Sequence, residues 1–347
     1  MTRREALAVP LILTAAKGAA RLPVMGSGAH TYEVTHDWAR PPDHLRFGNT
    51  HAIIADSQGR FIVAHTVHQS SVSADAIAIF DRDGRFVTSW GADLRGGAHG
   101  LTIRREGSEE FLYHCDNVRG FVRKTTLTGE EVWIMHAPVA SGLYASAREY
   151  KPSNLAIAPN GDLYIADGYG KFYIHHYDSQ LRWIRSFGGS RAEMDKDPKR
   201  ETGLGTTIWP HAIAIDTRGP RPLLMVGERG ANSRIQYFTL EGQPLHVVKD
   251  GVRWPSTFEF GAGGLMLMPD LKAVVTLFDA ANRPVAVLGD GMKPDGSSYQ
   301  GIRDQPRSAF RPGQFVAPHG ACFDAEGNIF VAEWVEVGRI SKLRKVA

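Results

Sequence analysis

Residues 209–216 read Trp209-Pro210-His211-Ala212-Ile213-Ala214-Ile215-Asp216: a tight turn, a histidine, and an apolar run that is typical of a buried strand. The same pattern recurs in residues 97–103 and 317–324, and in a weaker form in residues 48–56. Recurrence at intervals of about 45–60 residues is typical of propeller blades. We therefore expect the histidines of the four copies to occupy equivalent positions in a repeated structural unit.

Beyond residue 31 the chain alternates between short apolar runs and tight turns, with almost no helical periodicity. Dipeptides that end in glycine, such as Asp83-Gly84 and Asn160-Gly161, supply the positive φ angle that hairpin turns require. Alignment on the strand after the histidine predicts six four-stranded units, which start near His51, His99, Asn154, His211, Thr257 and His319. Six such sheets around an axis form an all-β, six-bladed β-propeller.

The last unit contains only three predicted strands before Ala347. We expect residues 31–34, Thr-Tyr-Glu-Val, to supply its fourth strand. This N-terminal strand would close the last blade and remove an exposed sheet edge. The predicted propeller domain covers residues 29–347.

Residues 1–28 have the pattern of a twin-arginine export signal. Arg3 and Arg4 precede an apolar run from Ala8 to Ala16, and small residues follow around Ala19. The run is too short for a membrane span, which needs about 20 apolar residues, and no other segment is suitable. The pattern predicts a disordered N-terminus and an exported, periplasmic protein. The alternative is an N-terminal helix that belongs to a mature cytoplasmic protein.

The composition is ordinary for a globular protein and gives no indication of nucleic-acid binding. Apolar residues make up 43% of the chain, charged residues 22%, and the net charge of +3 forms no basic stripe. The two cysteines, Cys115 and Cys322, form no CxxC motif, so we expect no disulfide framework. The number of subunits cannot be inferred from these features.

Three stretches do not fit the repeat: residues 137–150, 188–207 and 289–314. Each joins the outer strand of one unit to the inner strand of the next, and the histidines lie where inner strands begin. We therefore expect these loops to wall the mouth of a central channel that takes a small-molecule substrate. The alternative for each loop is a tolerated surface insertion.

Histidine occupies four of the six positions at which an inner strand begins, and rotational repetition directs all four to the axis. Three converging imidazoles form an open tetrahedral zinc site with one position left for water or substrate. We predict that His99, His211 and His319 bind zinc or another divalent transition metal. His51 is either a fourth ligand or an acid/base group. The alternative is a wet channel in which the histidines bind water and backbone groups.

A second set of polar residues ends the second strand of each unit: His65, Asp116, Asp167, Glu228, Asp270 and Glu333. Such carboxylates either cap the following loop by accepting backbone N–H groups or support the histidines from behind. Just beyond this ring, we predict that Tyr169 acts as a base and that Arg229 binds a substrate carboxylate with two hydrogen bonds.

Several of these motifs together resemble the peptidyl-α-hydroxyglycine α-amidating lyase family, which is built from NHL-type repeats. The motifs are residues 99–103, 167–169, 209–211, 228–229 with 233–236, and 317–319. The resemblance spans residues 47–343 and implies a six-bladed propeller with zinc in its channel. That family breaks the C–N bond of a hydroxyglycine hemiaminal and releases an amide and glyoxylate. By this resemblance His99, His211 and His319 are zinc ligands, while Tyr169 and Arg229 are active-site residues.

The chain also departs from the family pattern, and we interpret it as a bacterial offshoot. Thr66 replaces an arginine of the first blade, Ala317 a methionine, and Gly320 an acidic residue that helps to hold calcium. We therefore expect the transition metal to be kept, calcium to be absent from the family position, and the substrate to be altered. The main hypothesis is a metal-dependent lyase. The alternatives are a metal-dependent hydrolase or lactonase for a sugar-like substrate, and a non-enzymatic NHL-repeat binding propeller.

Overall fold

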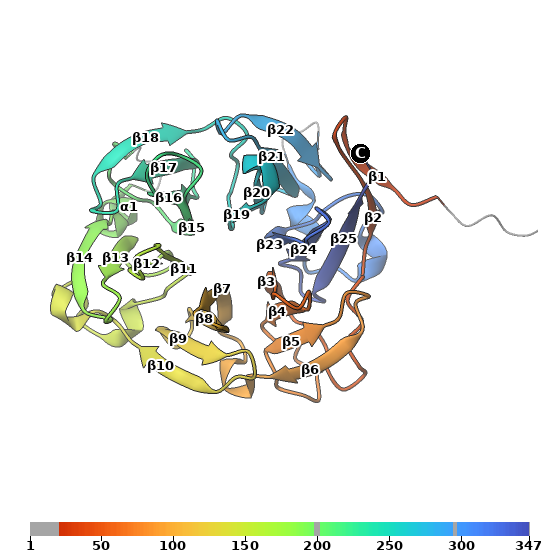
Figure 1. The fold of residues 1–347 in the computed structure, drawn as a ribbon, viewed down its shortest axis with the longest axis horizontal. Helices are drawn as coiled ribbons and strands as arrows, with labels where there is room; N and C mark the ends of the chain where they lie inside the picture. The colour runs from red at the N-terminus through yellow and green to blue at the C-terminus, as the bar shows by residue number, and fades with distance from the viewer. Residues whose placement is uncertain (1–20, 198–201, 294–296, 347) are drawn as a thin grey trace, which may run out of the picture.

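The computed structural model describes residues 21–197, 202–293 and 297–346. Six antiparallel sheets surround a central axis in this part of the chain and form the predicted six-bladed β-propeller (Figure 1). In blades one to five the strands follow one another from the axis to the rim. The arginine pair and apolar run of the predicted export signal fall on residues 1–20, outside the described residues.

The strands of the first five blades agree with the repeat that the sequence predicted. Blades one to three contain β3 (Thr50–Ala55), β4 (Phe61–His65), β5 (Ile77–Phe80), β6 (Phe86–Trp90), β7 (Ala98–Glu106), β8 (Glu109–Asp116), β9 (Phe121–Thr126), β10 (Glu131–Met135), β11 (Asn154–Ile157), β12 (Leu163–Ala166), β13 (Tyr173–Tyr177) and β14 (Trp183–Gly188). Blades four and five contain β15 (Pro210–Asp216), β16 (Leu223–Glu228), β17 (Arg234–Phe238), β18 (Pro244–Val248), β19 (Glu259–Phe260), β20 (Met266–Asp270), β21 (Val274–Phe278) and β22 (Pro284–Leu288).

Blade six is closed by the N-terminal segment, as predicted. Its sheet has the order β23 (Pro318–Phe323), β24 (Ile329–Glu333), β25 (Arg339–Lys345), β2 (His30–Thr35) and β1 (Val24–Ser27). Strand β2 pairs antiparallel with β25, with Val34 opposite Leu343. Strand β1 adds a fifth strand and lies before residue 29, where the sequence placed the start of the propeller. It is held there because Met25 is buried in one cluster with Leu288 of blade five.

Apolar side chains fill the spaces between neighbouring blades. Phe61 of β4 packs against Phe330 of β24, with ring centroids 3.9 Å apart, and this contact joins blades one and six. Ile62 and Leu112 belong to the cluster between blades one and two. Because such interiors are as dense as organic crystals, the blades form a rigid frame that fixes the inner strands around the axis.

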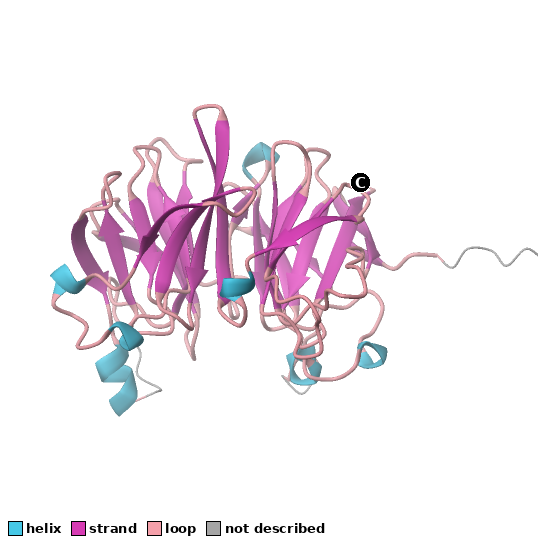
Figure 2. Ribbon diagram, turned by 90° about the horizontal axis from the view of Figure 1, so that it is seen from below, coloured by secondary structure: helices cyan, strands magenta, loops and turns pink. Residues whose placement is uncertain are grey.

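The helical segments are short and lie mostly in connecting loops. They are α1 (Arg191–Lys196) and the 3-10 helices η1 (Ala92–Leu94), η2 (Val139–Ser141), η3 (Ala147–Glu149), η4 (Ala262–Gly264), η5 (Tyr299–Ile302) and η6 (Arg307–Ala309). The three irregular loops contain η2, η3, α1, η5 and η6, and Figure 2 shows most helical turns on one face of the disc. We call the face on which the inner strands begin the mouth face. Across the described residues, no helix has the length and hydropathy needed to cross a lipid bilayer.

Candidate functional site

Each of the four predicted histidines occupies a β-bulge at the start of an inner strand. In blade one, for example, Thr50 pairs with His65 and Ala52 pairs with Ala64, so His51 is the extra residue between them. The same register shift occurs at His99, His211 and His319. A bulge leaves one residue unpaired and redirects its side chain. In blade three, by contrast, Asn154 pairs directly with Ala166 without a shift.

The bulges bring the four imidazole rings together at the axis. His99 and His319 lie 4.9 Å apart, and each lies 4.6–4.9 Å from both His51 and His211, measured between ring centroids. His51 and His211 therefore occupy opposite corners of the cluster. All four side chains are buried, with 2–6% of their surface exposed. The predicted convergence of these residues is thus present in the fold, whereas their role as ligands stays a prediction.

Three of the imidazoles are held by the next blade through the same hydrogen bond. The Nδ1–H groups of His99 and His211 donate to the carbonyl oxygens of Ser153 and Ser256 at 2.7 and 2.8 Å. His319 Nδ1 donates to the carbonyl oxygen of His51 at 2.8 Å. A proton fixed on Nδ1 leaves the lone pair on Nε2, which is how metal-ligating histidines are oriented. The Nδ1 atom of His51 is different, since it is buried without a hydrogen-bond partner among the described residues.

Gly320 allows blade six to approach blade one closely enough for this bond. A Cβ atom at that position would lie 2.7 Å from both the Cα atom of Ala52 and the carbonyl oxygen of His51. Gly100 plays the same part after His99, because a Cβ atom there would lie 2.7 Å from the carbonyl oxygen of Ser153. The acidic residue of the lyase family cannot be accommodated at position 320 without displacing the neighbouring backbone.

Tyr169 and Arg229 reach the cluster from the mouth face. Tyr169 lies in the turn after β12, and its hydroxyl is 2.9 Å from His211 Nε2 and 3.1 Å from His99 Nε2. Arg229 follows β16, and its Nη1 donates to the Tyr169 hydroxyl at 3.4 Å. Both residues therefore lie where the sequence placed them, beside the predicted ligands. Burial raises the pKa of Tyr169 above its usual value, and the nearby guanidinium opposes that shift.

Arg229 is a buried cation without a carboxylate partner. Its side chain is 6% exposed, and its Nε and Nη2 groups donate to the Pro255 carbonyl oxygen and the Ser256 hydroxyl at 2.9 and 2.8 Å. The described residues contain no ion pair to this guanidinium, and burial lowers its pKa. Because leaving a charge buried and unpaired is costly, such a group indicates a binding site for an anion.

The histidine cluster fits a divalent transition metal. Burial lowers the pKa of His99 to about 3 and the pKa values of His211 and His319 well below their usual range. The rings are therefore neutral, which is the form that binds metal. The Nε2 atoms of His99 and His211 lie 3.3 Å apart, and with both protons held on Nδ1 their lone pairs face one another. A cation between them would relieve that repulsion.

One triad has the ligand spacing of a metal site, and the hydrogen bonds to backbone carbonyls indicate a different, overlapping triad. Ring nitrogens of His51, His99 and His319 all lie within 4.8 Å of one another. The hydrogen bonds to backbone carbonyls instead select His99, His211 and His319. We favour the second triad, because its three rings have a defined tautomer and His51 does not.

Arg303 is a charged residue near the site that the sequence analysis missed. It follows η5 in the loop of residues 289–314, stacks on Trp334 at 3.5 Å and donates to Asn49 Oδ1 at 2.8 Å. Burial is the largest cause that lowers the pKa of His51, and the charges of His99 and Arg229 follow. The charge of Arg303 lowers this pKa further. The hydroxyl oxygen of Thr66 accepts a hydrogen bond from the backbone N–H of Asn49 at 3.0 Å, and this side chain carries no charge. An arginine in a loop predicted to wall the channel was the only signal for this residue.

A cavity of about 510 Å³ opens on the mouth face beside Trp209 and Arg253. Residues of α1 form part of its wall, so the loop of residues 188–207 borders this cavity. Trp209 is 40% exposed and its ring lies 6.3 Å from that of Trp254. Lys272 rests on Trp254 at 4.9 Å and has no acidic partner in the described part of the chain. The cavity thus offers aromatic surface and an unpaired lysine; its lining includes Trp209, two residues before His211, but none of the ring histidines.

Two of the acidic residues at the ends of the second strands, Asp167 and Asp270, bind the loops that follow, whereas Glu228 and Glu333 form buried ion pairs with Arg234 and Arg339. Asp167 accepts hydrogen bonds from the backbone N–H groups of Lys151 and Lys171 at 2.7 and 2.6 Å. Asp270 accepts from the N–H of Lys272 at 2.8 Å. Burial raises the pKa of Asp167 to about 6, although these N–H groups lower it. Of the two predicted roles, the capping role accounts for these contacts, and Asp167 thereby fixes the turn that carries Tyr169.

Comparison with known proteins agrees with the resemblance read from the motifs. No family model matches the chain. The human NHL repeat-containing protein 3 is 24% identical over 277 residues, which cover 75% of this chain and 72% of that protein. Peptidyl-alpha-hydroxyglycine alpha-amidating lyases 1 and 2 of Drosophila melanogaster are each 23% identical, over 342 and 217 residues. The chain is similar to both groups.

The two fly lyases are longer than this chain. The matches cover 88% and 56% of this chain but 58% and 48% of lyases 1 and 2, so the chain spans about half their length. The predicted resemblance is confirmed at this distant level, whereas the predicted bacterial origin stays a prediction.

Solved structures share the fold at low sequence identity. Virginiamycin B lyase from Staphylococcus aureus has a TM-score of 0.54 at 16% identity, covering 91% of this chain and 100% of that chain. A putative gluconolactonase has a TM-score of 0.55 at 13% identity, covering 91% and 94%. A Bacteroides thetaiotaomicron protein of unknown function has a TM-score of 0.57 at 13% identity, covering 90% and 75%. These likenesses bear on the propeller fold alone.

Proposed function

We propose that this chain is a metal-dependent lyase that acts on a small anionic substrate, similar to the amidating lyases but with altered specificity. One observation carries the proposal. Three imidazoles with fixed tautomers, the Tyr169 hydroxyl and the unpaired guanidinium of Arg229 converge at one point of the channel mouth. The distant similarity to the fly lyases supports the reaction class.

His99, His211 and His319 would hold zinc or a similar divalent metal through their Nε2 atoms. When bound, such a metal supplies Lewis-acid polarisation of a substrate oxygen and lowers the pKa of a coordinated water. The carbonyl oxygens of Ser153 and Ser256 keep two of the imidazoles oriented before substrate arrives. The imidazoles therefore need not reorient during the reaction. Polar groups that are oriented in advance are the main source of electrostatic catalysis.

Arg229 and Tyr169 would act directly on the substrate. A carboxylate is the natural partner for a buried guanidinium, and it would orient the substrate with its reacting carbon towards Tyr169. In a hydroxyglycine, the hydroxyl proton leaves its oxygen while the C–N bond breaks and the amide nitrogen gains a proton. The Tyr169 hydroxyl is placed to accept or return a proton at its oxygen. His51 is the second candidate for this task, because its Nδ1 has no fixed partner.

The cavity beside Trp209 would hold the remainder of the substrate. Its aromatic wall suits an apolar group, and Lys272 suits a second negative charge. Arg253 contributes less charge to this cavity, because Asp290 binds it through two hydrogen bonds of 2.8 and 2.9 Å. These contacts suit a substrate that carries an apolar group and a second negative charge.

A metal-dependent hydrolase or lactonase for a sugar-like substrate is the second candidate. Thr66 stands where the amidating lyases have an arginine, and a substrate without a carboxylate would not need that arginine. The likeness to a putative gluconolactonase is compatible with this alternative. A non-enzymatic NHL-repeat binding propeller is the third, and it does not require imidazoles at the axis.

Metal analysis and two activity assays separate these functions. Purified protein should contain about one divalent transition metal per chain and release glyoxylate from benzoyl-hydroxyglycine. His211→Ala should lose both properties, whereas His246→Ala, at the exposed rim of the same blade, should keep both. A metal-bound protein that opens lactones but releases no glyoxylate would support the second candidate. Absence of any transition metal, or full activity of His211→Ala, would overturn the lyase.

A further inference from the structure

A second cavity lies in the channel beyond the histidines. Its volume is about 480 Å³, and it is lined by the inner strands after they pass the bulges. Leu101 and Ile213, each two residues after a ring histidine, lie on its wall, and Arg104 and Phe260 mark its far end. Tyr169 and Arg229 do not line it. It is therefore separate from the site on the mouth face and lies at the end of the channel towards which the inner strands run.

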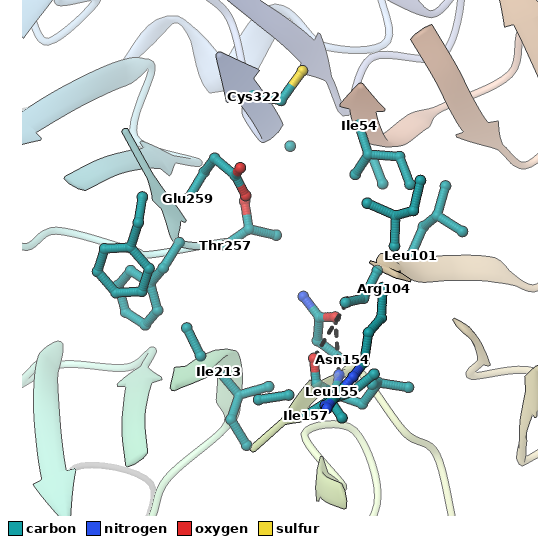
Figure 3. A pocket seen from close by; sticks show the side chains of 18 of the residues that line it. Ile54, Leu101, Arg104, Asn154, Leu155, Ile157, Ile213, Thr257, Glu259 and Cys322 are labelled. Atoms are coloured by element: carbon teal, nitrogen blue, oxygen red, sulfur yellow. Dashed lines mark hydrogen bonds between the residues drawn. The ribbon is translucent and has the colours of Figure 1, made fainter. Parts of the chain in front are cut away.

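The wall of this far-end cavity is mostly apolar. Figure 3 shows Ile54, Leu101, Leu155 and Ile213 around the hollow, contributed by four different blades. A volume between about 300 and 1,000 Å³ is typical of small-molecule sites with apolar walls and a few polar groups. The cavity thus has the size and lining of a binding site for an organic molecule.

One acidic side chain enters this apolar space. Glu259 of β19 is the only carboxylate of the lining, and Figure 3 shows it projecting towards the hollow. Its backbone pairs with Leu267 of β20, whereas its side-chain carboxylate makes no hydrogen bond or ion pair with the described residues. Burial raises its pKa to about 7. Its carboxyl group is therefore available to a ligand.

Arg104, the other charged group of the lining, forms no ion pair with the described residues and lies across the hollow from Glu259 (Figure 3). Arg104 donates to the carbonyl oxygens of Ala158 and Pro159 at 2.7 and 3.4 Å. The amide oxygen of Asn154 accepts the N–H of Leu155 at 2.9 Å. An anionic ligand beside Glu259 would meet a like charge, because the guanidinium of Arg104 is held on backbone carbonyls at the far end of the cavity. A metal ion such as calcium would find one carboxylate where it requires six to eight oxygen ligands.

We propose that the far-end cavity binds an organic cation: a protonated amine that pairs with Glu259 and carries an apolar body held by Leu101 and Ile213. The amine supplies a positive charge to pair with the half-buried carboxylate, and the apolar body displaces water from the aliphatic wall. This site is independent of the proposed lyase reaction, because Tyr169, Arg229 and the four ring histidines are not part of its lining.

Calorimetry with two matched probes tests this proposal on the full chain. 2-Phenylethylamine and 2-phenylethanol have the same apolar body and differ in charge. The wild type should bind the amine at least tenfold more tightly than the alcohol, and Glu259→Gln should bind both equally. Glu326→Gln, an exposed substitution, should behave as wild type. The amine affinity should fall as the pH drops below 7, where Glu259 becomes neutral; Arg104 and Cys322 are the other titratable groups that line the cavity.

The proposal is overturned if the wild type binds neither probe, binds both equally, or if Glu259→Gln keeps the preference for the amine. If Glu259→Gln fails to fold, Ile54→Trp provides a second test, because its larger ring fills the cavity and leaves the carboxylate in place. Ile54→Trp should abolish amine binding, and retained binding would contradict the site. Zinc content should be equal in wild type, Glu259→Gln and Ile54→Trp, which keeps this outcome separate from the lyase proposal.

Discussion

Replacing Gly320 with alanine should destabilise the propeller and disturb the histidine cluster. The added Cβ atom would lie 2.7 Å from the Cα atom of Ala52 and from the carbonyl oxygen of His51. Both are backbone atoms, so no side-chain rotation relieves the clash. Blade six must move away from blade one, and the 2.8 Å hydrogen bond from His319 Nδ1 to the His51 carbonyl lengthens.

The size of this effect follows from its two parts. Overpacking a dense interior costs about 1–3 kcal/mol, and losing a buried hydrogen bond costs about 0.5–1.5 kcal/mol. We therefore expect the free energy of unfolding to fall by about 2–4 kcal/mol. Urea unfolding followed by tryptophan fluorescence measures this change. Gly219→Ala is the matched control, since a Cβ atom there meets only the Arg221 carbonyl oxygen, at 3.9 Å.

Zinc affinity provides the second readout of the same substitution. Removing the hydrogen bond that orients a metal-ligating histidine typically weakens binding about 10–100-fold. Folded Gly320→Ala should show such a loss, whereas Gly219→Ala should bind zinc as the wild type does. Equal unfolding free energies for the two variants would refute the clash. An unchanged zinc affinity in Gly320→Ala would show that the bond to His51 does not position His319.

Two further substitutions and one deletion test other parts of the structure. Tyr169→Phe should keep the metal, because no ligand is removed, but should lower the rate of glyoxylate release about 10²–10⁴-fold through loss of the proton-transferring hydroxyl. Removing residues 1–37 deletes β1 and β2, whose buried residues include Tyr32 and Val34, so calorimetry should show a melting temperature at least about 10 °C lower. Burial lowers the pKa of His114 to about 3. The unfolded chain therefore accepts a proton at this residue below about pH 6.5 while the folded chain does not, and the wild type loses about 2 kcal/mol of stability by pH 5. His114→Gln should remove this loss.

Each of these outcomes has its own control and its own contrary result. Tyr173→Phe should leave the rate unchanged, and a Tyr169→Phe variant with more than a tenth of the wild-type rate would contradict the role of the hydroxyl. Leu22→Ala, an exposed substitution, should not alter melting, and an equally stable 1–37 deletion would contradict closure by β2. For His114→Gln, unfolding free energies at pH 5 and pH 8 should differ by about 2 kcal/mol less than in the wild type; an equal difference would exclude His114 as the cause.

The repeat predicted the fold and the meeting of the histidines, because symmetry places equivalent residues at one axis. His99 and His211 are 112 residues apart, yet their Nε2 atoms lie 3.3 Å apart. The positions of residues outside the repeat could not be predicted from symmetry. Arg303 lies in an irregular loop whose path follows from its own packing on Trp334. Glu259 belongs to a two-residue inner strand, too short for its alternation to show which side chain faces the channel.

The β-bulges could not be predicted from the sequence either. They explain why the four histidines of the cluster differ in their hydrogen bonds. A bulge is defined by the register of two strands, which no single strand reveals. Once the four rings face the axis, each Nδ1–H needs an acceptor from the next blade. Ser153 and Ser256 provide carbonyls for His99 and His211, and His51 provides one for His319.

His51 is the exception, since its own Nδ1 finds no acceptor among the described residues. A buried polar group without a partner costs about 1–3 kcal/mol, and the bond from His319 to the His51 backbone does not offset it. Nothing fixes the tautomer of His51, so its proton can reside on either nitrogen. That freedom is a disadvantage for a metal ligand and a requirement for a group that moves protons. The arrangement therefore favours His99, His211 and His319 as the ligand set and His51 as the neighbouring acid/base.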